Sequence, residues 1–282
     1  MPIKAFRLHQ NQLIPLNTPA SSLDLFTASL ADGFYTTFSS LAAGTKVLGL
    51  KSHLQRLYQP AEKMNLKPSA DEKTLREKIA KLTHENLPNE SRIRLILTKN
   101  TGDIYIAIQP FEPLPPSIYQ HGAHVTTSQI TRHDPRIKGT NFITQSQAQR
   151  KLLNQDVFEI LLTKHGKIYE GMTSNFYAIK YGEKRSSRPL LITAQRGILL
   201  GVTRKAVLKL AREAGLSIQY RAPLIRESYD EAFLTSSSRG VVPIVSIDDK
   251  PVGQGKVGEW TKKLIRAYQE YIRKKSEYIV PL

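Results

Sequence analysis

Apolar residues in the first hundred positions recur with the spacings of short strands and amphipathic helices. Runs rich in aromatic and β-branched residues predict strands, and apolar residues spaced three or four apart predict helices. The sequence Lys99-Asn100-Thr101-Gly102 separates two such runs, as the turn of a hairpin does. The predicted elements are strands at 33–38, 46–50, 92–97 and 103–108, a helix that begins at Ser52, and another that begins at Ser69 or Asp71.

Prolines divide this first part of the chain from the second. Four of them crowd into the segment from Pro110 to Pro116. Proline fixes φ and cannot donate a backbone hydrogen bond, so the segment predicts a stiff, extended linker. We therefore expect a small α/β domain at 1–109, a Pro-rich interdomain linker at 110–122 and a large domain at 123–282.

The second part of the chain alternates short strand-like runs with helical stretches. This alternation favours an α+β protein whose larger domain has a mixed or barrel-like sheet. The expected strands are 124–130, 159–163, 167–169, 175–180, 190–193, 232–235 and 244–247, and the expected helices lie near 145–153, 203–214 and 257–275.

The charge of the chain is strongly basic. It has 41 lysines and arginines against 24 aspartates and glutamates, a formal net charge of +17. Such an excess can bind nucleic-acid phosphates, but the basic residues are spread along the chain and no recognition motif for nucleic acid is present. A basic surface that attracts anionic metabolites is therefore favoured, and no nucleic-acid partner is expected.

Two further kinds of site receive no support from the composition. The chain has no cysteine, so it offers no disulfide framework and no thiolate site, and no metal is expected. No apolar run is long enough for a membrane span, and the first residues lack the apolar core of a signal peptide. We expect a cytoplasmic protein without a membrane partner.

Two residues carry the strongest chemical signal. Lys138 precedes Gly139 and Thr140, small residues that let a ligand approach closely, and a lysine amine can form an imine with an aldehyde. Glu170 ends a predicted hairpin, where Gly171 permits a sharp change of direction. A carboxylate bonded to a pyridine nitrogen keeps that nitrogen protonated. Most lysines and glutamates are solvated, but the pair together indicates pyridoxal phosphate chemistry.

Two later segments offer donors for a phosphate group. Gly201 precedes a predicted helix, so the amides of Val202 and Thr203 lie at the positive end of the helix dipole without partners inside the helix. The alternative is that Thr203 is a plain N-cap. Ser237 is the central residue of three successive serines and offers a hydroxyl and an amide. Its alternative is a solvated turn.

These segments and the sequence His53-Leu54-Gln55-Arg56-Leu57 resemble the fold-class IV pyridoxal-phosphate enzymes. That family contains branched-chain and D-amino-acid aminotransferases and aminodeoxychorismate lyases. The resemblance extends from about Gly33 to Gly258 and covers most of the chain. It implies the two-domain fold of class IV aminotransferases, with a small N-terminal α/β domain and a larger C-terminal domain that has a barrel-like mixed sheet.

The resemblance also implies a cofactor, pyridoxal 5′-phosphate, and the residues that hold it. Lys138 would be the Schiff-base lysine and the catalytic base, and Glu170 the partner of the pyridine nitrogen. The family assembles as dimers or larger symmetric oligomers, and a homodimer is expected. The implied cofactor-binding residues are Arg56, Lys138, Glu170, Val202, Thr203 and Ser237.

The chain departs from the family pattern at two positions. Asn141 stands near the place where branched-chain enzymes usually carry a tyrosine, and Ser39 stands where many members have an arginine. The substrate carboxylate would then be held differently. The alternatives are Arg92, Arg94 and the backbone amides around Ser237.

The favoured function is an aminotransferase that moves an amino group between an amino acid and a 2-oxo acid through Lys138. The segment Glu170 to Phe176 resembles the aminotransferase members. The alternative is an aminodeoxychorismate lyase that produces 4-aminobenzoate and pyruvate, a pattern that the segment Asp32 to Thr37 somewhat resembles. Whether the amino acid is D or L stays open in the sequence.

Overall fold

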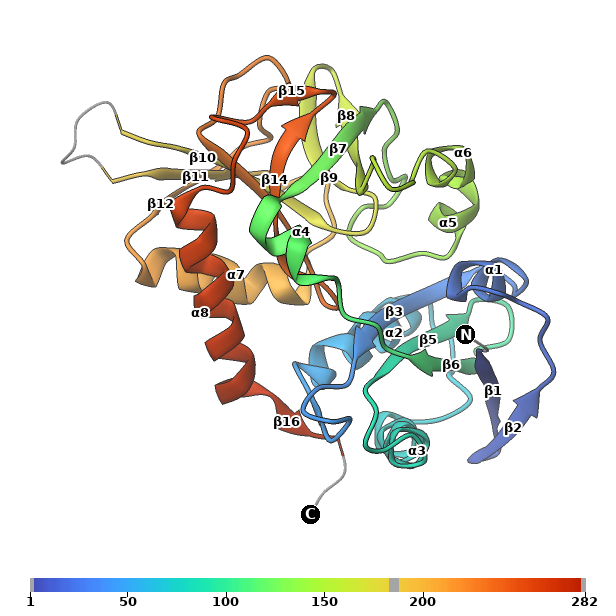
Figure 1. Ribbon diagram of the computed structural model, residues 1–282. Coiled ribbons are helices and arrows are strands. Elements are labelled where there is room, and N and C mark those ends of the chain that lie inside the picture. The colour runs from blue at the N-terminus through green and yellow to red at the C-terminus, as the bar shows by residue number, and fades with distance from the viewer. Residues whose placement is uncertain (1–2, 183–187, 280–282) are drawn as a thin grey trace. The chain divides into compact units, whose positions relative to one another are not determined.

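The structure is a computed structural model, and it describes residues 3–182 and 188–279 of the chain (Figure 1). The internal contacts of the chain divide it into two compact units. Unit 1 comprises Met1–Glu112, Ile137–Gln145 and Lys274–Leu282, and unit 2 comprises Pro113–Arg136 and Ser146–Arg273. After Glu112 the chain enters unit 2, and two later segments, 137–145 and 274–282, are assigned to unit 1 again.

Unit 1 is built on a five-stranded antiparallel sheet in the order β2-β1-β6-β5-β3. Buried leucines and isoleucines of α2 and α3 pack on one face of this sheet. Residues of α1 and α5 pack on the other face. The elements are β1 (Lys4–His9), β2 (Gln12–Leu16), β3 (Gly33–Ser39), β4 (Lys46–Val47), β5 (Ser91–Thr98), β6 (Ile104–Pro110), β16 (Glu277–Tyr278), which pairs with β4, α1 (Leu23–Ala28), α2 (Leu50–Lys63), α3 (Glu72–His84) and α5 (Asn141–Gln145).

The predicted strands β3, β5 and β6 are confirmed, and so is the start of α3, because the Asp71 carboxylate caps that helix by accepting from the Thr74 amide at 2.7 Å. The predicted start of α2 at Ser52 is wrong. The helix begins at Leu50, since Gly49 adopts a left-handed conformation with φ of 66° and turns the chain directly into the helix.

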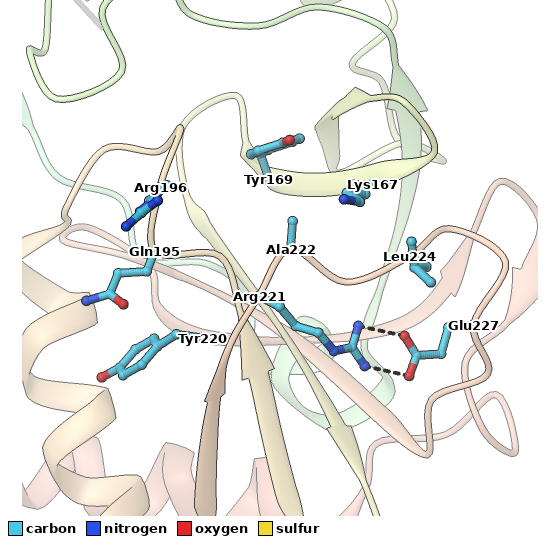
Figure 2. A pocket seen from close by; sticks show the side chains of 9 residues that line it. All are labelled: Lys167, Tyr169, Gln195, Arg196, Tyr220, Arg221, Ala222, Leu224 and Glu227. Atoms are coloured by element: carbon cyan, nitrogen blue, oxygen red, sulfur yellow. Dashed lines mark hydrogen bonds and ion pairs between the residues drawn. The ribbon is translucent and has the colours of Figure 1, made fainter.

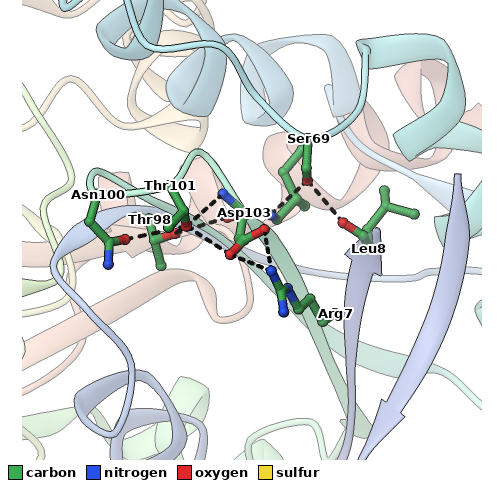
Figure 3. A network of polar contacts seen from close by, with 8 residues as sticks. Arg7, Leu8, Ser69, Thr98, Asn100, Thr101 and Asp103 are labelled. Atoms are coloured by element: carbon green, nitrogen blue, oxygen red, sulfur yellow. Dashed lines mark hydrogen bonds and ion pairs between the residues drawn. The ribbon is translucent and has the colours of Figure 1, made fainter. Parts of the chain in front are cut away.

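A polar network fastens β1 to the β5–β6 hairpin (Figure 3). Arg7 Nη2 donates to both carboxylate oxygens of Asp103, each at 3.0 Å, and the Thr101 hydroxyl donates to the same carboxylate at 2.7 Å. The Ser69 hydroxyl donates to the Leu8 carbonyl at 2.9 Å, which ties the connection between α2 and α3 to the same strand. The network thereby holds the end of the sheet at which Gly33 of β3 pairs with Thr98 of β5.

Unit 2 is built on a closed barrel. Its ring runs β10-β13-β14-β7-β8-β9 and closes because β9 pairs with both β8 and β10. The strands are β7 (Ala123–Ser128), β8 (Glu159–Lys164), β9 (Lys167–Gly171), β10 (Asn175–Lys180), β11 (Leu190–Thr193), β12 (Ser217–Tyr220), β13 (Glu231–Ser236), β14 (Gly240–Ile247) and β15 (Lys250–Pro251). The helices are α4 (Pro116–His121), α6 (Gln147–Arg150), α7 (Val202–Glu213) and α8 (Glu259–Lys275).

The barrel-like mixed sheet predicted from the sequence is confirmed. Two pairings in the ring, β7 with β8 and β14 with β7, are parallel, and the others are antiparallel. One apolar cluster draws residues from every strand of the ring: Ala123, Val125, Leu161, Ile168, Phe176, Ala178, Ala232, Leu234, Val242 and Ile244. This core fixes the strands against one another and so gives their ends defined positions.

The proline-rich stretch is not extended throughout. It contains α4, whose first residue is Pro116 and whose N-cap is Pro115. Proline suits the first helical position, because its missing N–H has no partner there in any case. Among the described residues, no helix is long and apolar enough to cross a membrane.

Candidate active site

Lys138 lies in a short extended segment that pairs with the edge strand β3. The Tyr35 amide donates to the Lys138 carbonyl at 2.9 Å, and the Thr140 amide donates to the Gly33 carbonyl at 2.9 Å. Gly33 is required on the other side of β3, since a Cβ there would lie 2.2 Å from the carbonyl oxygen of Leu97 in β5. The segment is therefore held to β3 by backbone hydrogen bonds, and the side chain of Lys138 is half-buried.

The amine of Lys138 lies against an aromatic ring. Lys138 Nζ is 4.6 Å from the centroid of the Tyr35 ring, and Arg94 Cζ is 5.0 Å from the same centroid. Arg94 is buried and donates to Asp24 Oδ1 at 2.6 Å and to the Thr37 hydroxyl at 2.9 Å. Arg94 is therefore engaged with protein groups, which disfavours it as the holder of a substrate carboxylate.

A buried histidine lies within the electrostatic reach of both Lys138 and Arg56, a residue of α2. His53 is almost fully buried, and its Nδ1 is 2.7 Å from the Thr36 hydroxyl. Burial holds the pKa of His53 well below its usual value of 6.5, and the positive charges of Arg56 and Lys138 lower it further. Unit 1 therefore brings two of the predicted cofactor-binding residues close to one neutral imidazole.

This histidine makes the stability of the protein depend on pH. The unfolded chain binds a proton on His53 below pH 6.5, whereas the folded chain excludes it because its pKa is lower. The free energy of unfolding should then fall by up to about 1.4 kcal/mol per pH unit as the pH drops below 6.5. Chemical unfolding between pH 5 and 8, at about half-unit steps, should show a shallower decline for His53→Asn than for the wild type. Equal slopes would contradict the prediction.

Glu170 lies in β9, and its carboxylate is buried with 2% of the residue exposed. Oε1 accepts from Arg132 Nε at 2.9 Å, and Oε2 accepts from the Leu199 amide at 3.0 Å. Arg132 Nη2 also donates to the Met172 carbonyl at 2.7 Å. Each carboxylate oxygen has a second lone pair, so the group can accept a further N–H. The solvated glutamate that the sequence allowed as an alternative is excluded.

Contacts of Asn175 and Leu199 link Glu170 to the start of α7. Asn175 lies opposite Glu170 in the barrel, and its Nδ2 donates to the Leu199 carbonyl at 2.7 Å. Leu199 is thus held at both its carbonyl and its amide. A Cβ on Gly201 would lie 2.4 Å from Asn175 Oδ1, so only glycine lets the helix begin this close to the barrel.

The first turn of α7 presents backbone amides. The N-cap is Gly201, which has no side chain to accept hydrogen bonds from the first amides of the helix. Val202 and Thr203 are the first helical residues. The sequence alternative that Thr203 is the N-cap is therefore wrong. The Tyr268 hydroxyl is 3.3 Å from Thr203 Oγ1, and burial raises the pKa of Tyr268 to about 12, so this hydroxyl stays a donor.

Ser237 lies in the turn that joins β13 to β14. Ser236 and Gly240 form the last pair of that ladder, and Arg239 Nε donates to the Ser236 hydroxyl at 3.1 Å. The ring of Tyr268 lies 3.3 Å from the position that a Cβ on Gly240 would occupy. Tyr268 therefore contacts the start of α7 and lies against Gly240, the residue of β14 that directly follows the serine turn.

A buried carboxylate beneath the serine turn holds it in place. Glu159 is 1% exposed, and its Oε2 accepts from Arg239 Nη2 at 2.9 Å, from the Thr173 hydroxyl at 2.6 Å and from the Ser174 hydroxyl at 3.2 Å. The guanidinium of Arg239 also lies 5.1 Å from the centre of the Phe158 ring. Glu159 thereby joins the turn that carries Ser237 to the segment that follows Glu170.

Comparison with known proteins decides the family. A family model described as amino-transferase class IV matches residues 33–247. The chain belongs to the class IV aminotransferases. It is an aminotransferase that uses pyridoxal phosphate, and its substrates are amino acids and 2-oxo acids. The predicted family, cofactor and aminotransferase activity are confirmed, and the lyase alternative gains no support.

Named relatives of this class IV aminotransferase resemble it over most of its length. It is 27% identical to a D-alanine aminotransferase of Bacillus licheniformis over 79% of this chain and 82% of that protein. It is also 27% identical to a branched-chain-amino-acid aminotransferase of Pseudomonas aeruginosa, over 83% of this chain and 81% of the relative. The solved branched-chain amino acid aminotransferase of Thermobaculum terrenum superposes with a TM-score of 0.77 at 21% identity, covering 99% of this chain and 98% of that one. The predicted fold class is confirmed by this likeness.

Sequence reasoning missed three residues that hold the site together. Arg132 pairs with Glu170 across 38 positions, and Arg239 pairs with Glu159 across 80. Neither pairing follows a short motif, so the sequence alone gives no signal for the partners. The one available hint is Glu159 itself, an acidic residue at the start of an otherwise apolar strand.

Proposed function

We propose that Lys138 carries the transamination and that the remaining predicted residues bind the cofactor. The observation that carries this proposal is the buried carboxylate of Glu170, held by Arg132 and by the Leu199 amide. Burying a carboxylate costs solvation free energy that an ion pair can fail to recover, so the fold alone gives little reason to keep a glutamate here. Leu199, whose amide donates to this carboxylate, lies three positions before the first residue of α7.

The donors of the described residues fit pyridoxal phosphate. A phosphate needs backbone amides, hydroxyls and a cation. The uncapped start of α7, the serine turn and Arg56 offer these groups. A pyridine nitrogen needs a carboxylate, and the guanidinium of Arg132 beside Glu170 complements the negative charge of that group. When bound, the cofactor supplies an aldehyde for the amino donor and a ring that accepts electrons.

The protein residues then have distinct tasks. Lys138 would hold the cofactor and would move the proton at the substrate Cα as general base and acid. Glu170 would hold the proton on the ring nitrogen. Val202, Thr203 and Ser237 orient the phosphate through amides and hydroxyls.

The assembly and location of the protein are also proposed. We infer that units 1 and 2 correspond to the small and large domains, with a boundary in the proline-rich segment 110–122. A homodimer and a cytoplasmic location are proposed from the family resemblance and from the absence of a spanning helix among the described residues. The amino donor is proposed to be aliphatic, since the named relatives act on branched-chain amino acids and D-alanine.

The activity is tested with a panel of D- and L-amino donors against 2-oxoglutarate and pyruvate. The new amino acid and the new 2-oxo acid are both measured. Aliphatic donors should give both products in equal amounts, and aromatic or acidic donors much less. Pyruvate formed from aminodeoxychorismate without any 2-oxo acid acceptor would support the lyase and overturn this proposal.

Replacing Glu159 by glutamine should weaken cofactor binding without removing catalysis. The substitution takes the negative charge from Arg239 and loosens the turn that carries Ser237. We expect the dissociation constant of pyridoxal phosphate to rise by about tenfold, the effect of losing one charge-assisted contact. Absorbance titration of the apoenzyme measures it.

A matched control for this prediction is Glu231→Gln. Glu231 is equally buried, but its carboxylate accepts from Thr261 at the start of α8 rather than from the serine turn. It should therefore cost stability and leave the dissociation constant near that of the wild type. A similar weakening in both variants would show that Glu159 acts only through the fold.

A further inference from the structure

A pocket of about 710 Å³ opens on unit 2, outside the residues assigned to the cofactor. It is formed by β9, by the segment that follows β11 and by the segment that follows β12, as Figure 2 shows. The segment after β12 is fastened along β9, since the Ile168 amide donates to the Pro223 carbonyl at 2.8 Å and the Ile225 amide donates to the Gly166 carbonyl at 2.9 Å. The lining residues are Lys167, Tyr169, Gln195, Arg196, Tyr220, Arg221, Ala222, Leu224 and Glu227.

The charge of the pocket is positive. Three of its residues are cationic, Lys167, Arg196 and Arg221, and Glu227 is the one carboxylate among the lining residues. Arg221 donates to both oxygens of Glu227, at 2.8 and 2.7 Å. Among the residues that the structure describes, Lys167 and Arg196 make no ion pair.

The carboxylate of Glu227 already accepts hydrogen bonds from several protein groups. Besides Arg221, the Tyr229 hydroxyl donates to it at 2.8 Å and Lys180 Nζ at 3.2 Å. The hydrogen bonds from Arg221, followed by those from Tyr229 and Lys180, lower the pKa of Glu227 to about 2. The carboxylate therefore neutralises Arg221 and leaves the charges of Lys167 and Arg196 for a ligand.

An aromatic wall accompanies these charges. Figure 2 shows the Tyr169 ring and the Ala222 methyl on facing segments, with Lys167 and Arg196 to either side of the ring in that view. The backbone of Gly197 packs closely against the Tyr169 ring, because a Cβ on Gly197 would lie 3.0 Å from two carbons of that ring. A braced tyrosine beside a small residue leaves space for a flat group to stack.

We propose that this pocket binds an anionic ligand with a planar ring, of the nucleoside monophosphate class. The anionic group would contact Lys167 and Arg196, and the ring would stack on Tyr169. Phosphate on a lysine and an arginine is a charge-assisted contact of the strong kind. The volume accommodates a molecule of this size, since ligand pockets commonly measure about 300–1,000 Å³.

The site adjoins the carboxylate of Glu170 without sharing its residues. Gln195 and Arg196 line the pocket, and Leu199, three positions further on, donates to Glu170. The proposal does not rest on the role of Lys138 or on the transamination. Its failure and the failure of the proposed function are therefore separate results.

The test is a calorimetric titration of the holoenzyme with three probes: adenosine 5′-monophosphate, ribose 5-phosphate and adenosine. The first probe carries the ring and the charge, and each of the others carries one of them. Adenosine 5′-monophosphate should bind at least about tenfold more tightly than either partial probe. Absence of binding at about 10 mM, near the weakest affinity of a specific site, would overturn the proposal.

Variants locate the binding. Arg196→Ala and Lys167→Ala should each weaken the binding of adenosine 5′-monophosphate by about tenfold. Tyr169→Leu should make it bind no better than ribose 5-phosphate. Lys256→Ala is the matched control, an exposed cation of the same unit outside the pocket, and should change nothing.

Two outcomes would assign the binding elsewhere. Equal weakening by Lys256→Ala would mean that the phosphate responds only to the overall positive charge. Binding to the apoenzyme but not to the holoenzyme would mean that the probe occupies the phosphate site of the cofactor. Either result overturns the proposal.

Discussion

Replacing Lys138 by alanine is expected to lower turnover by at least about 10³-fold, because the same amine binds the cofactor and moves the proton. The purified variant should also lose the absorption at about 420 nm that a lysine-bound cofactor gives. Turnover is measured with the best donor of the amino acid panel. The backbone hydrogen bond from the Tyr35 amide to the Lys138 carbonyl does not depend on the side chain, so the segment should keep its place on β3.

Lys73→Ala is a suitable control, since Lys73 is an exposed lysine of the same unit. It should leave turnover and absorption unchanged. Borohydride reduction of the wild type should fix the cofactor to the peptide that contains residue 138. Label on another peptide, or turnover that survives the alanine substitution, would remove Lys138 from the mechanism.

Substitutions of Glu170, alone and together with Arg132, should separate the contribution of this ion pair to stability from its contribution to turnover. Their side chains are 3% and 4% exposed. Glu170→Ala leaves a buried guanidinium without its carboxylate, which costs about 3–5 kcal/mol of unfolding free energy. Turnover should fall by about 10²–10³-fold, the usual effect of removing one group that stabilises charge in the reaction.

The double substitution Glu170→Leu with Arg132→Met distinguishes the two effects. Apolar residues of similar volume often replace a buried ion pair with little loss, so the free energy of unfolding should return to within about 2 kcal/mol of the wild type. Turnover should stay as low as in Glu170→Ala. Chemical unfolding of the apoenzyme and steady-state kinetics measure the two quantities. A double variant that regains both stability and turnover would make the pair a structural feature alone.

The sequence revealed the elements whose signals are local. β3 and the β5–β6 hairpin are dense in β-branched and aromatic residues, and a glycine turn separates the hairpin strands. The start of α3 was visible because Asp71 caps it with its own side chain. The start of α2 was not, since Gly49 acts through its backbone conformation and Ser52 is only the third helical residue.

The candidate site shows the same division. Lys138 and Glu170 stand in recognisable short motifs, so their chemistry could be inferred before the fold. The burial of Glu170 could not be inferred, because it depends on the closure of the barrel between β9 and β10. Arg132 and Arg239 are positioned by contacts across 38 and 80 residues, and no local pattern encodes such a distance.

The way in which the chain returns to unit 1 has a practical consequence for dissecting this protein. Gly139 bridges to Phe34, and the Glu277 carboxylate accepts from the Leu50 amide at 2.9 Å. A gene fragment that ends at Glu112 would lack both partners and expose the edge of β3. That fragment should therefore be unstable alone, and it should recover its fold only when a second fragment supplies 137–145 and 274–279 in trans.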